Sequence, residues 1–128
     1  MKRSYKYLFF IIAFFSIIFF SCKQKIENKI DGDWRMVDVN SMSTNTQEWT
    51  LMDGYIYMKK NTANSTFDTL SYGTYIIKIK RLTRYLKITE CNNKYMVGEY
   101  KIMKLTNKHL ELYRDENANY QYYEFIKK

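Results

Sequence analysis

The stretch GTYIIKIKRLTRYLKITE, residues 73–90, decides the fold class of this chain. A period of two places Tyr75, Ile77 and Ile79 on one face, because successive side chains of a β-strand point to opposite sides. After a short interruption, Leu86 and Ile88 repeat the same period. The stretch therefore predicts two strands joined by a turn, each with an apolar face toward a core.

The same alternation continues outward from this stretch in both directions. Proline is absent, and tyrosine and β-branched residues, which favour strands, are dense. Tyr100 and Ile102 are expected to point inward, with Lys101 outward between them. The predicted strands cover residues 33–40, 54–60, 66–70, 73–80, 84–89, 95–105, 109–114 and 120–127. About eight short strands joined by polar turns predict an all-β fold, a small antiparallel up-and-down β-barrel.

One segment departs from the strand pattern. Residues 45–48 (NTQE) resemble a capping box that opens a short helix, and Trp49, Leu51 and Met52 follow it. We expect one helical turn here, in the long first connection between strands, lying across one mouth of the barrel.

The N-terminus has the three parts of a secretory signal. Three basic residues lie within the first six, residues 8–20 (LFFIIAFFSIIFF) carry no charge, and the small Ser21 follows. The apolar run has 13 residues, whereas a membrane-spanning helix needs about 20. These features predict a cleaved signal helix. An uncleaved signal anchor, or a secreted protein without an anchor, is the alternative.

Ser21-Cys22 resembles the lipobox of bacterial lipoproteins, in which the cysteine thiol receives a diacylglyceryl group. The resemblance implies cleavage after Ser21 and lipid attachment at Cys22, usually with N-acylation as well. Two or more acyl chains hold a protein stably on a membrane. We therefore expect a lipoprotein signal peptide at residues 1–21, a polar tether at 22–31 and a barrel domain at 32–128.

The charge of the expected mature chain bears on its partners. Removal of the signal peptide takes away three basic residues and leaves 18 basic and 13 acidic side chains, a net charge of +5. The lysines are scattered through the predicted strands, where they discourage sheet-to-sheet aggregation. We do not expect an exported chain of this kind to bind nucleic acid. Anionic lipid headgroups are a more natural partner for the surplus charge.

Reactive residues do not converge in the sequence. The single histidine, His109, lies between Lys108 and Leu110, and no cysteine pair has the spacing of zinc ligands. We expect neither an enzyme nor a bound cofactor or metal. If Cys22 is lipidated, Cys91 has no disulfide partner within the chain. It is then an incidental thiol or forms a disulfide between chains.

Three motifs make the expected domain similar to lipocalin-like proteins, in particular the small lipocalin-like lipoproteins of Bacteroidetes. Residues 32–34 (GDW) match the Gly-x-Trp that opens lipocalin barrels, and residues 73–75 (GTY) resemble a mid-chain strand of the bacterial group. The alternating strands and terminal lysines of residues 105–128 resemble the ending of that group. The resemblance covers residues 32–128, nearly the whole mature domain.

The resemblance also implies roles for single residues. Trp34, at the start of the first strand, is expected to plug the closed end of the barrel. In lipocalins a basic residue near the C-terminus covers this tryptophan, and the candidates here are Arg114 and Lys127.

The interior of an eight-stranded barrel is either filled by side chains or wide enough for one small ligand. The lipocalin resemblance implies a ligand cavity for a small apolar or aromatic molecule. Its expected lining is Tyr75, Ile77, Leu86, Ile88, Tyr100 and Ile102.

Two functions follow as hypotheses. The first is a lipid-anchored envelope lipoprotein that binds a small hydrophobic ligand. The alternative is a structural or inhibitory lipoprotein that binds another envelope protein through the barrel exterior or rim. An exposed apolar patch near Trp49, Leu51 and Met52 would favour the alternative.

The residues after Cys22 bear on localisation. In Bacteroidetes lipoproteins an acidic run at this place accompanies export to the cell surface, whereas this chain has residues 23–25 (KQK). The resemblance implies a lipid-anchored protein of the cell envelope, in the outer membrane and facing the periplasm.

Overall fold

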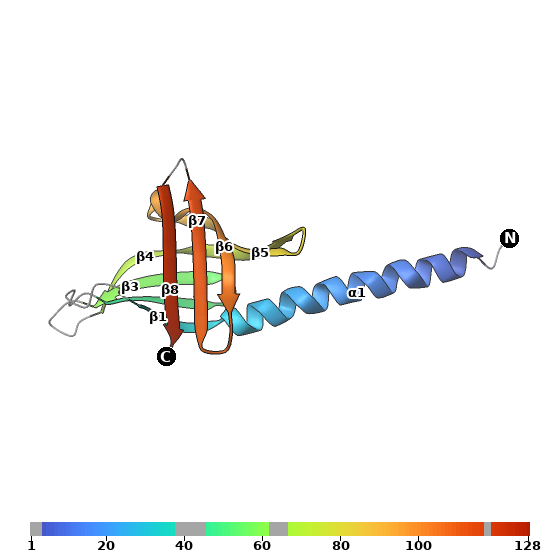
Figure 1. Ribbon diagram of the computed structural model, residues 1–128, viewed down its shortest axis with the longest axis horizontal. Coiled ribbons are helices and arrows are strands. Elements are labelled where there is room, and N and C mark those ends of the chain that lie inside the picture. Colours follow the sequence, from blue (N-terminus) through green and yellow to red (C-terminus); the bar gives the residue numbers. More distant parts are fainter. Residues whose placement is uncertain (1–3, 38–45, 62–66, 117–118) are drawn as a thin grey trace.

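The computed structural model describes residues 4–37, 46–61, 67–116 and 119–128. It is a closed antiparallel barrel of eight strands that follows one long helix (Figure 1), so the expected fold class is confirmed. A short 3-10 helix, η1, spans Lys94–Met96. The long helix is α1 Ser4–Ile30, and the strands are β1 Gly32–Met36, β2 Thr46–Met52, β3 Tyr55–Asn61, β4 Phe67–Lys80, β5 Thr83–Cys91, β6 Gly98–Leu105, β7 His109–Glu116 and β8 Asn119–Lys127.

The barrel closes in simple up-and-down order. Each strand pairs antiparallel with its neighbours in the sequence, and β8 pairs with β1, with Trp34 opposite Lys127. Each of these eight strands is therefore paired on both sides over part of its length. The inward positions of the strands, together with Ile26 and Ile30 of α1, form one core. The buried core residues of the strands are Trp34, Trp49, Leu51, Ile56, Met58, Tyr75, Ile77, Leu86, Ile88, Tyr100, Ile102, Leu105, Leu110, Leu112 and Phe125.

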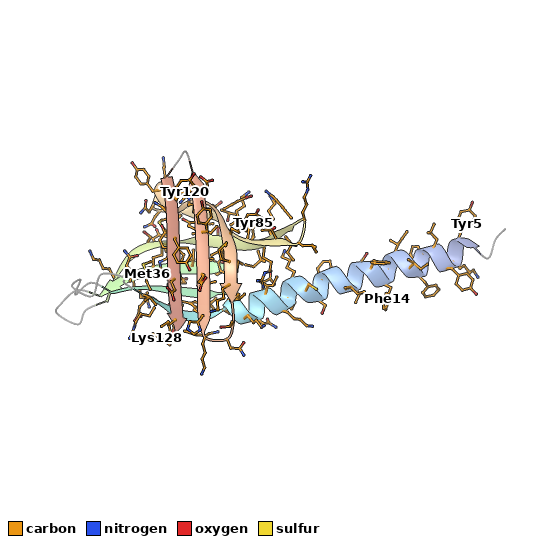
Figure 2. All side chains as sticks on the ribbon, in the orientation of Figure 1. Tyr5, Phe14, Met36, Tyr85, Tyr120 and Lys128 are labelled. Carbon is orange, nitrogen blue, oxygen red and sulfur yellow. The ribbon has the colours of Figure 1, made fainter. Side chains whose placement is uncertain are left out.

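The helix α1 has two parts with different surroundings. Its N-terminal part projects away from the barrel, and Figure 2 shows Tyr5 and Phe14 with no other element beside them. Its last turns pack on the barrel, where Ile26 and Ile30 are buried. Residues 22–30, which belong to the expected tether, are therefore helical and held against the domain.

One helix of the described chain is long and apolar enough to cross a membrane. It runs over Tyr5–Ile30, and none of its most apolar 18-residue window is buried. A signal sequence near the N-terminus passes the same test of length and composition, so this property fits both a signal and an anchor.

The predicted helical turn at residues 45–48 is wrong. Thr46, Gln47 and Glu48 lie in β2, which pairs with both β1 and β3, while residue 45 lies outside the described residues. A capping box stabilises a helix only through local hydrogen bonds. Here the strand places Trp49 and Leu51 in the core, and burial of two large apolar side chains outweighs the local signal.

Two other boundaries differ from expectation. The predicted strands 66–70 and 73–80 form one continuous strand, β4, of 14 residues, with residue 66 outside the described part. The first strand ends at Met36, earlier than predicted, and residues 38–40 also lie outside the described part. The expected number of strands is right because one strand was divided and another, β2, was missed.

The two ends of the barrel carry different elements. We call the end at which α1 joins β1 the helix end, and the end that carries η1 the far end. At the helix end, the β4–β5 hairpin projects beyond the barrel alongside α1 (Figure 1). Pairing of β4 with β3 stops at Thr74, and pairing of β5 with β6 starts at Tyr85, so the outer part of the hairpin pairs only with itself.

Candidate functional site

All six residues expected to line a ligand cavity point into the barrel and are buried. They come from three neighbouring strands: Tyr75 and Ile77 from β4, Leu86 and Ile88 from β5, and Tyr100 and Ile102 from β6. Their inward orientation could be predicted from the sequence because side chains of a strand alternate with a period of two. Ile79 shares the face of Tyr75 and Ile77 but is exposed, because it lies on the projecting part of the hairpin.

An aromatic cluster that includes Tyr100 lies among the inward side chains of the barrel. Trp49 of β2 lies 4.7 Å from Phe125 and 5.5 Å from Tyr123, ring centroid to ring centroid. Tyr100 lies edge-on to Trp49 at 6.2 Å and is 6.0 Å from Tyr123. Contacts of this length are typical of packed aromatic side chains. The cluster occupies the part of the interior between β2, β6 and β8.

The helix end of the barrel is closed by Trp34. Its indole Nε1 donates a hydrogen bond of 2.6 Å to the carbonyl oxygen of Ile30, and the side chain is fully buried. Lys127 Nζ lies 5.1 Å from the centroid of the Trp34 ring and 3.3 Å from the carbonyl oxygen of Lys29. Of the two basic candidates, Lys127 therefore covers the tryptophan and Arg114 does not. Gly32 has a φ of 133°, a conformation that other residues rarely adopt, and the end of the Lys127 side chain lies where a Cβ would project.

The far end is closed by Arg114, which is buried on the inner face of β7. Its Nη1 donates to the carbonyl oxygen of Tyr95 and, at 2.8 Å, to the hydroxyl of Tyr100, and its Nη2 donates to the carbonyl oxygen of Val97 at 2.8 Å. The Tyr100 hydroxyl in turn donates to the carbonyl oxygen of Met96. The guanidinium therefore ties the segment around η1 to the core of the barrel.

A polar contact joins α1 to β4. The Tyr75 hydroxyl donates a hydrogen bond of 2.7 Å to Asp31 Oδ1. Burial raises the pKa of the Tyr75 phenol well above its usual value, and the hydrogen bond to Asp31 raises it further. Beside this contact lies a hollow of about 370 Å³ whose walls include Glu27 and Asp53. The hollow lies between α1 and β4, and two of the six expected cavity residues, Tyr75 and Ile77, are among the residues that line it.

Large tyrosines gather on the outside of β3 and β4. Tyr57 and Tyr72 are directly paired across the two strands, Tyr55 lies two residues before Tyr57, and all three are exposed. The exposed Met52 and Ile76 flank them. We call these five residues the tyrosine face. A hollow of about 440 Å³ between Tyr55 and Tyr72 extends from this face toward Cys91 and Asn92.

The tyrosine face differs from the patch expected near residues 49–52. Trp49 and Leu51 belong to the core, because the period of two in β2 turns both of them inward. Only Met52 of that expected patch is exposed.

The remaining single residues lie apart from one another. Cys22 is exposed on α1, Cys91 is half-buried at the end of β5, and both are free thiols. His109 starts β7 at the helix end. Within residues 4–37, 46–61, 67–116 and 119–128, no three His, Cys, Asp or Glu side chains gather in a way that could hold a metal ion.

Arg114, Tyr123, Phe125 and Trp49 were not expected in the interior. For Tyr123 and Phe125 the alternation within the last strand was a usable signal, because the predicted strand contained both. Arg114 follows Leu110 and Leu112 at the same spacing of two, so the alternation placed it inward as well, but its charge argued for an exposed position. Comparisons with models of protein families, with curated proteins and with solved structures found no match.

Proposed function

We propose that this chain is a lipid-anchored envelope lipoprotein with a lipocalin-like barrel that binds a protein partner through its tyrosine face. The observation that carries the proposal is that the aromatic side chains form two groups, one inside the barrel and one on its surface. One group, around Trp49, fills the interior, and a second group, around Tyr72, is exposed on one side of the barrel.

The filled interior supports an external binding site. A small-ligand site is usually a concave apolar space of about 300–1,000 Å³ with a few polar groups. The hollow of about 440 Å³ lies on the outside of the barrel beside the tyrosine face, and the hollow of about 370 Å³ lies between α1 and β4. The interior instead holds stacked and edge-on rings, which give a rigid support for the outer face.

The composition of the tyrosine face supports a protein partner. Tyrosine is enriched at protein interfaces because a rigid ring offers a large contact area while its hydroxyl binds polar groups. Around Tyr57 and Tyr72, β3 and β4 are each paired on both sides, so no strand edge is free there for an added strand. Recognition must therefore use side chains, and a flat partner surface with apolar contacts and hydrogen-bond acceptors suits this face.

The exposed start of α1 supports the anchor. Its apolar residues make no contact with the barrel, as expected for a segment that is either removed or embedded in lipid. Cys22 is exposed where α1 meets the barrel, accessible to a modifying enzyme. In the outer membrane, lipid at this position would hold the barrel directly at the periplasmic surface.

Metabolic labelling with an alkyne analogue of palmitate tests the anchor. We expect label on the full chain and on Cys91→Ser, and loss of label together with accumulation of the uncleaved form for Cys22→Ser. Cys91→Ser is the matched control because it also removes one free thiol. Equal labelling of the two variants, or no label on the unaltered chain, would refute lipid attachment at Cys22.

Site-specific photo-crosslinking tests the partner site. A photoreactive phenylalanine analogue replaces Tyr72 in one sample and Tyr122 in another, in the envelope of cells that express the full chain. The two side chains have exposed fractions of 58% and 57% and lie on opposite sides of the barrel, on β4 and β8. We expect one discrete adduct from Tyr72 and none from Tyr122.

The captured partner is then purified, and its affinity is measured. We expect Tyr72→Ser to weaken binding by at least about tenfold and Tyr122→Ser to leave it unchanged, because a central interface tyrosine carries much of the binding energy. Equal effects of the two substitutions would refute the assignment of the face.

A small hydrophobic ligand is the second candidate function, and one observation favours it. The indole Nε1 of Trp49 is buried, with no hydrogen-bond partner among the described residues. Such a donor marks a place where a polar atom of a ligand or water is stabilising. Saturable change of the Trp49 emission by an apolar probe, unaffected by Tyr72→Ser, would favour this candidate, and a response that does not saturate would exclude it.

A further inference from the structure

The turn between β4 and β5 has an unfavourable sequence for its shape. Arg81 and Leu82 are its two central residues, with φ values of 47° and 67°. Turns with two left-handed residues normally contain Asn-Gly or Asp-Gly, because a bulky side chain is disfavoured in this conformation. Leu82 is also 97% exposed, the highest value among the large apolar side chains that the structure describes. Backbone strain of this kind is retained where it serves a function.

The surroundings of Leu82 are apolar. An open hollow of about 460 Å³ separates the hairpin from residues 22–29 of α1, and Ile79 and Leu82 line its hairpin side. Cys22 and Ile26 line its helix side. The hollow is therefore bordered by the residue at which lipid would be attached. The exposed apolar segment of α1 also leaves the barrel from this side (Figure 1).

Basic side chains surround this apolar surface. Lys25 and Lys29 of α1 and Arg84 of β5 line the hollow, and Arg81 lies next to Leu82 in the turn. No aspartate or glutamate is among the residues that line it. An exposed leucine within a ring of Lys and Arg is the arrangement of peripheral segments that bind anionic bilayers.

We propose that the β4–β5 hairpin docks on the bilayer surface, with Leu82 and Ile79 in the interface and Arg81, Arg84 and the helix lysines at anionic headgroups. The inference rests on the membrane attachment in the proposed function. It also identifies which side of the barrel contacts the membrane. The bilayer is the occupant because the anchor leaves the barrel beside this hollow. This holds whether α1 is retained or Cys22 carries lipid. Tethering raises the effective concentration of the hairpin at the surface, so that a small contact is enough.

Quenching by lipids with brominated acyl chains measures the depth of the hairpin. The full chain is reconstituted in phosphatidylcholine vesicles with and without phosphatidylglycerol, as unaltered protein, Leu82→Trp and Tyr95→Trp. The two native tryptophans are buried within the barrel and give a constant background. Tyr95 is the matched control because it is 88% exposed and lies at the far end, in η1.

We expect the added emission of Leu82→Trp to fall at least about twofold in brominated vesicles, more with the anionic lipid than without it. The Tyr95→Trp variant should be unaffected. Equal quenching of the two variants, with the chain still floating with the vesicles, would overturn the docking inference and leave the anchor standing. A chain that does not float with vesicles would overturn both the anchor and the inference.

Hydrogen exchange covers the case in which Leu82→Trp does not fold. Amides of residues 80–84 in the unaltered chain should exchange more slowly in anionic vesicles than in detergent micelles. Leu82→Gly, which suits the turn better, should lose this difference, and Tyr95→Gly should keep it. Retention of the difference in Leu82→Gly, or no difference in the unaltered chain, would overturn the inference.

Discussion

Replacement of Arg114 by methionine tests how much the guanidinium group contributes to closing the far end of the barrel. Methionine keeps the length and apolar stem of the side chain but removes the guanidinium. The hydrogen bonds to the carbonyl oxygens of Tyr95 and Val97 and to the Tyr100 hydroxyl are lost. We expect the segment around η1 to separate from the core while the eight strands remain paired.

The size of the effect follows from these three hydrogen bonds. Each hydrogen bond from a charged donor contributes about 1.5–3 kcal/mol to the free energy of unfolding. Two effects reduce the resulting decrease in the free energy of unfolding. The cost of burying a guanidinium disappears, and the freed carbonyl groups are hydrated at the barrel mouth. The expected net loss is about 2–4 kcal/mol. For a domain of this size it lowers the midpoint of urea unfolding by about 2 M.

Urea unfolding of the full chain in a mild detergent, followed by circular dichroism and tryptophan emission, measures this loss. Arg84→Met is the matched control, because Arg84 lies on the projecting hairpin rather than in the interior. Its free energy of unfolding should stay within about 0.5 kcal/mol of that of the unaltered chain. An Arg114→Met midpoint that matches this control would refute the reasoning, and a changed slope would mean that the denatured state was altered.

Three further predictions concern single residues. Tyr75→Phe should cost about 1 kcal/mol at neutral pH. Because burial and Asp31 raise the pKa of Tyr75 in the folded state, the unfolded chain loses this proton first above about pH 10. The free energy of unfolding then falls by up to about 1.4 kcal/mol per pH unit. The urea midpoint should therefore fall less steeply with rising pH for Tyr75→Phe than for the unaltered chain. The same dependence on pH in both proteins would contradict this prediction. Leu82→Gly should raise the free energy of unfolding by about 0.5–1 kcal/mol, because relief of the left-handed leucine outweighs the added entropy of the unfolded chain. Thermal unfolding measures this change. A lower midpoint temperature for Leu82→Gly would show that the turn is not strained. Gly73→Ala should cost at least about 2 kcal/mol, because a Cβ would overlap the carbonyl oxygen of Glu90 on β5; a midpoint equal to that of the unaltered chain would show that the two strands can move apart.

The fold class was predictable because it depends on a local pattern. In a strand the side chain alternates with every residue, so apolar residues such as Leu86 and Ile88 reveal the buried face without knowledge of the partner strands. The same period identified the six residues of β4, β5 and β6 that were expected to point inward. Strand β2 was missed because residues 45–48 carry a helix-start signal, and only the neighbouring β1 and β3 decide against it.

The candidate site was only partly predictable. The alternation correctly placed Tyr100 inside the barrel. It did not show that Tyr55, Tyr57 and Tyr72 gather on one outer face, because that depends on the pairing of β3 with β4. The backbone strain at Leu82 could not be predicted from the sequence either, because its φ depends on the tight connection between β4 and β5.

The sequence by itself determined the alternation of strands, the apolar N-terminal segment and the inward or outward direction of most side chains. These properties depend on the chemistry of residues close together in the chain. Only the tertiary structure decided that an aromatic cluster around Trp49 packs inside the barrel, that Lys127 rather than Arg114 covers Trp34, and that the β4–β5 hairpin lies beside α1. These are contacts between residues far apart in the sequence, and their energies depend on distances that exist only after the barrel has closed.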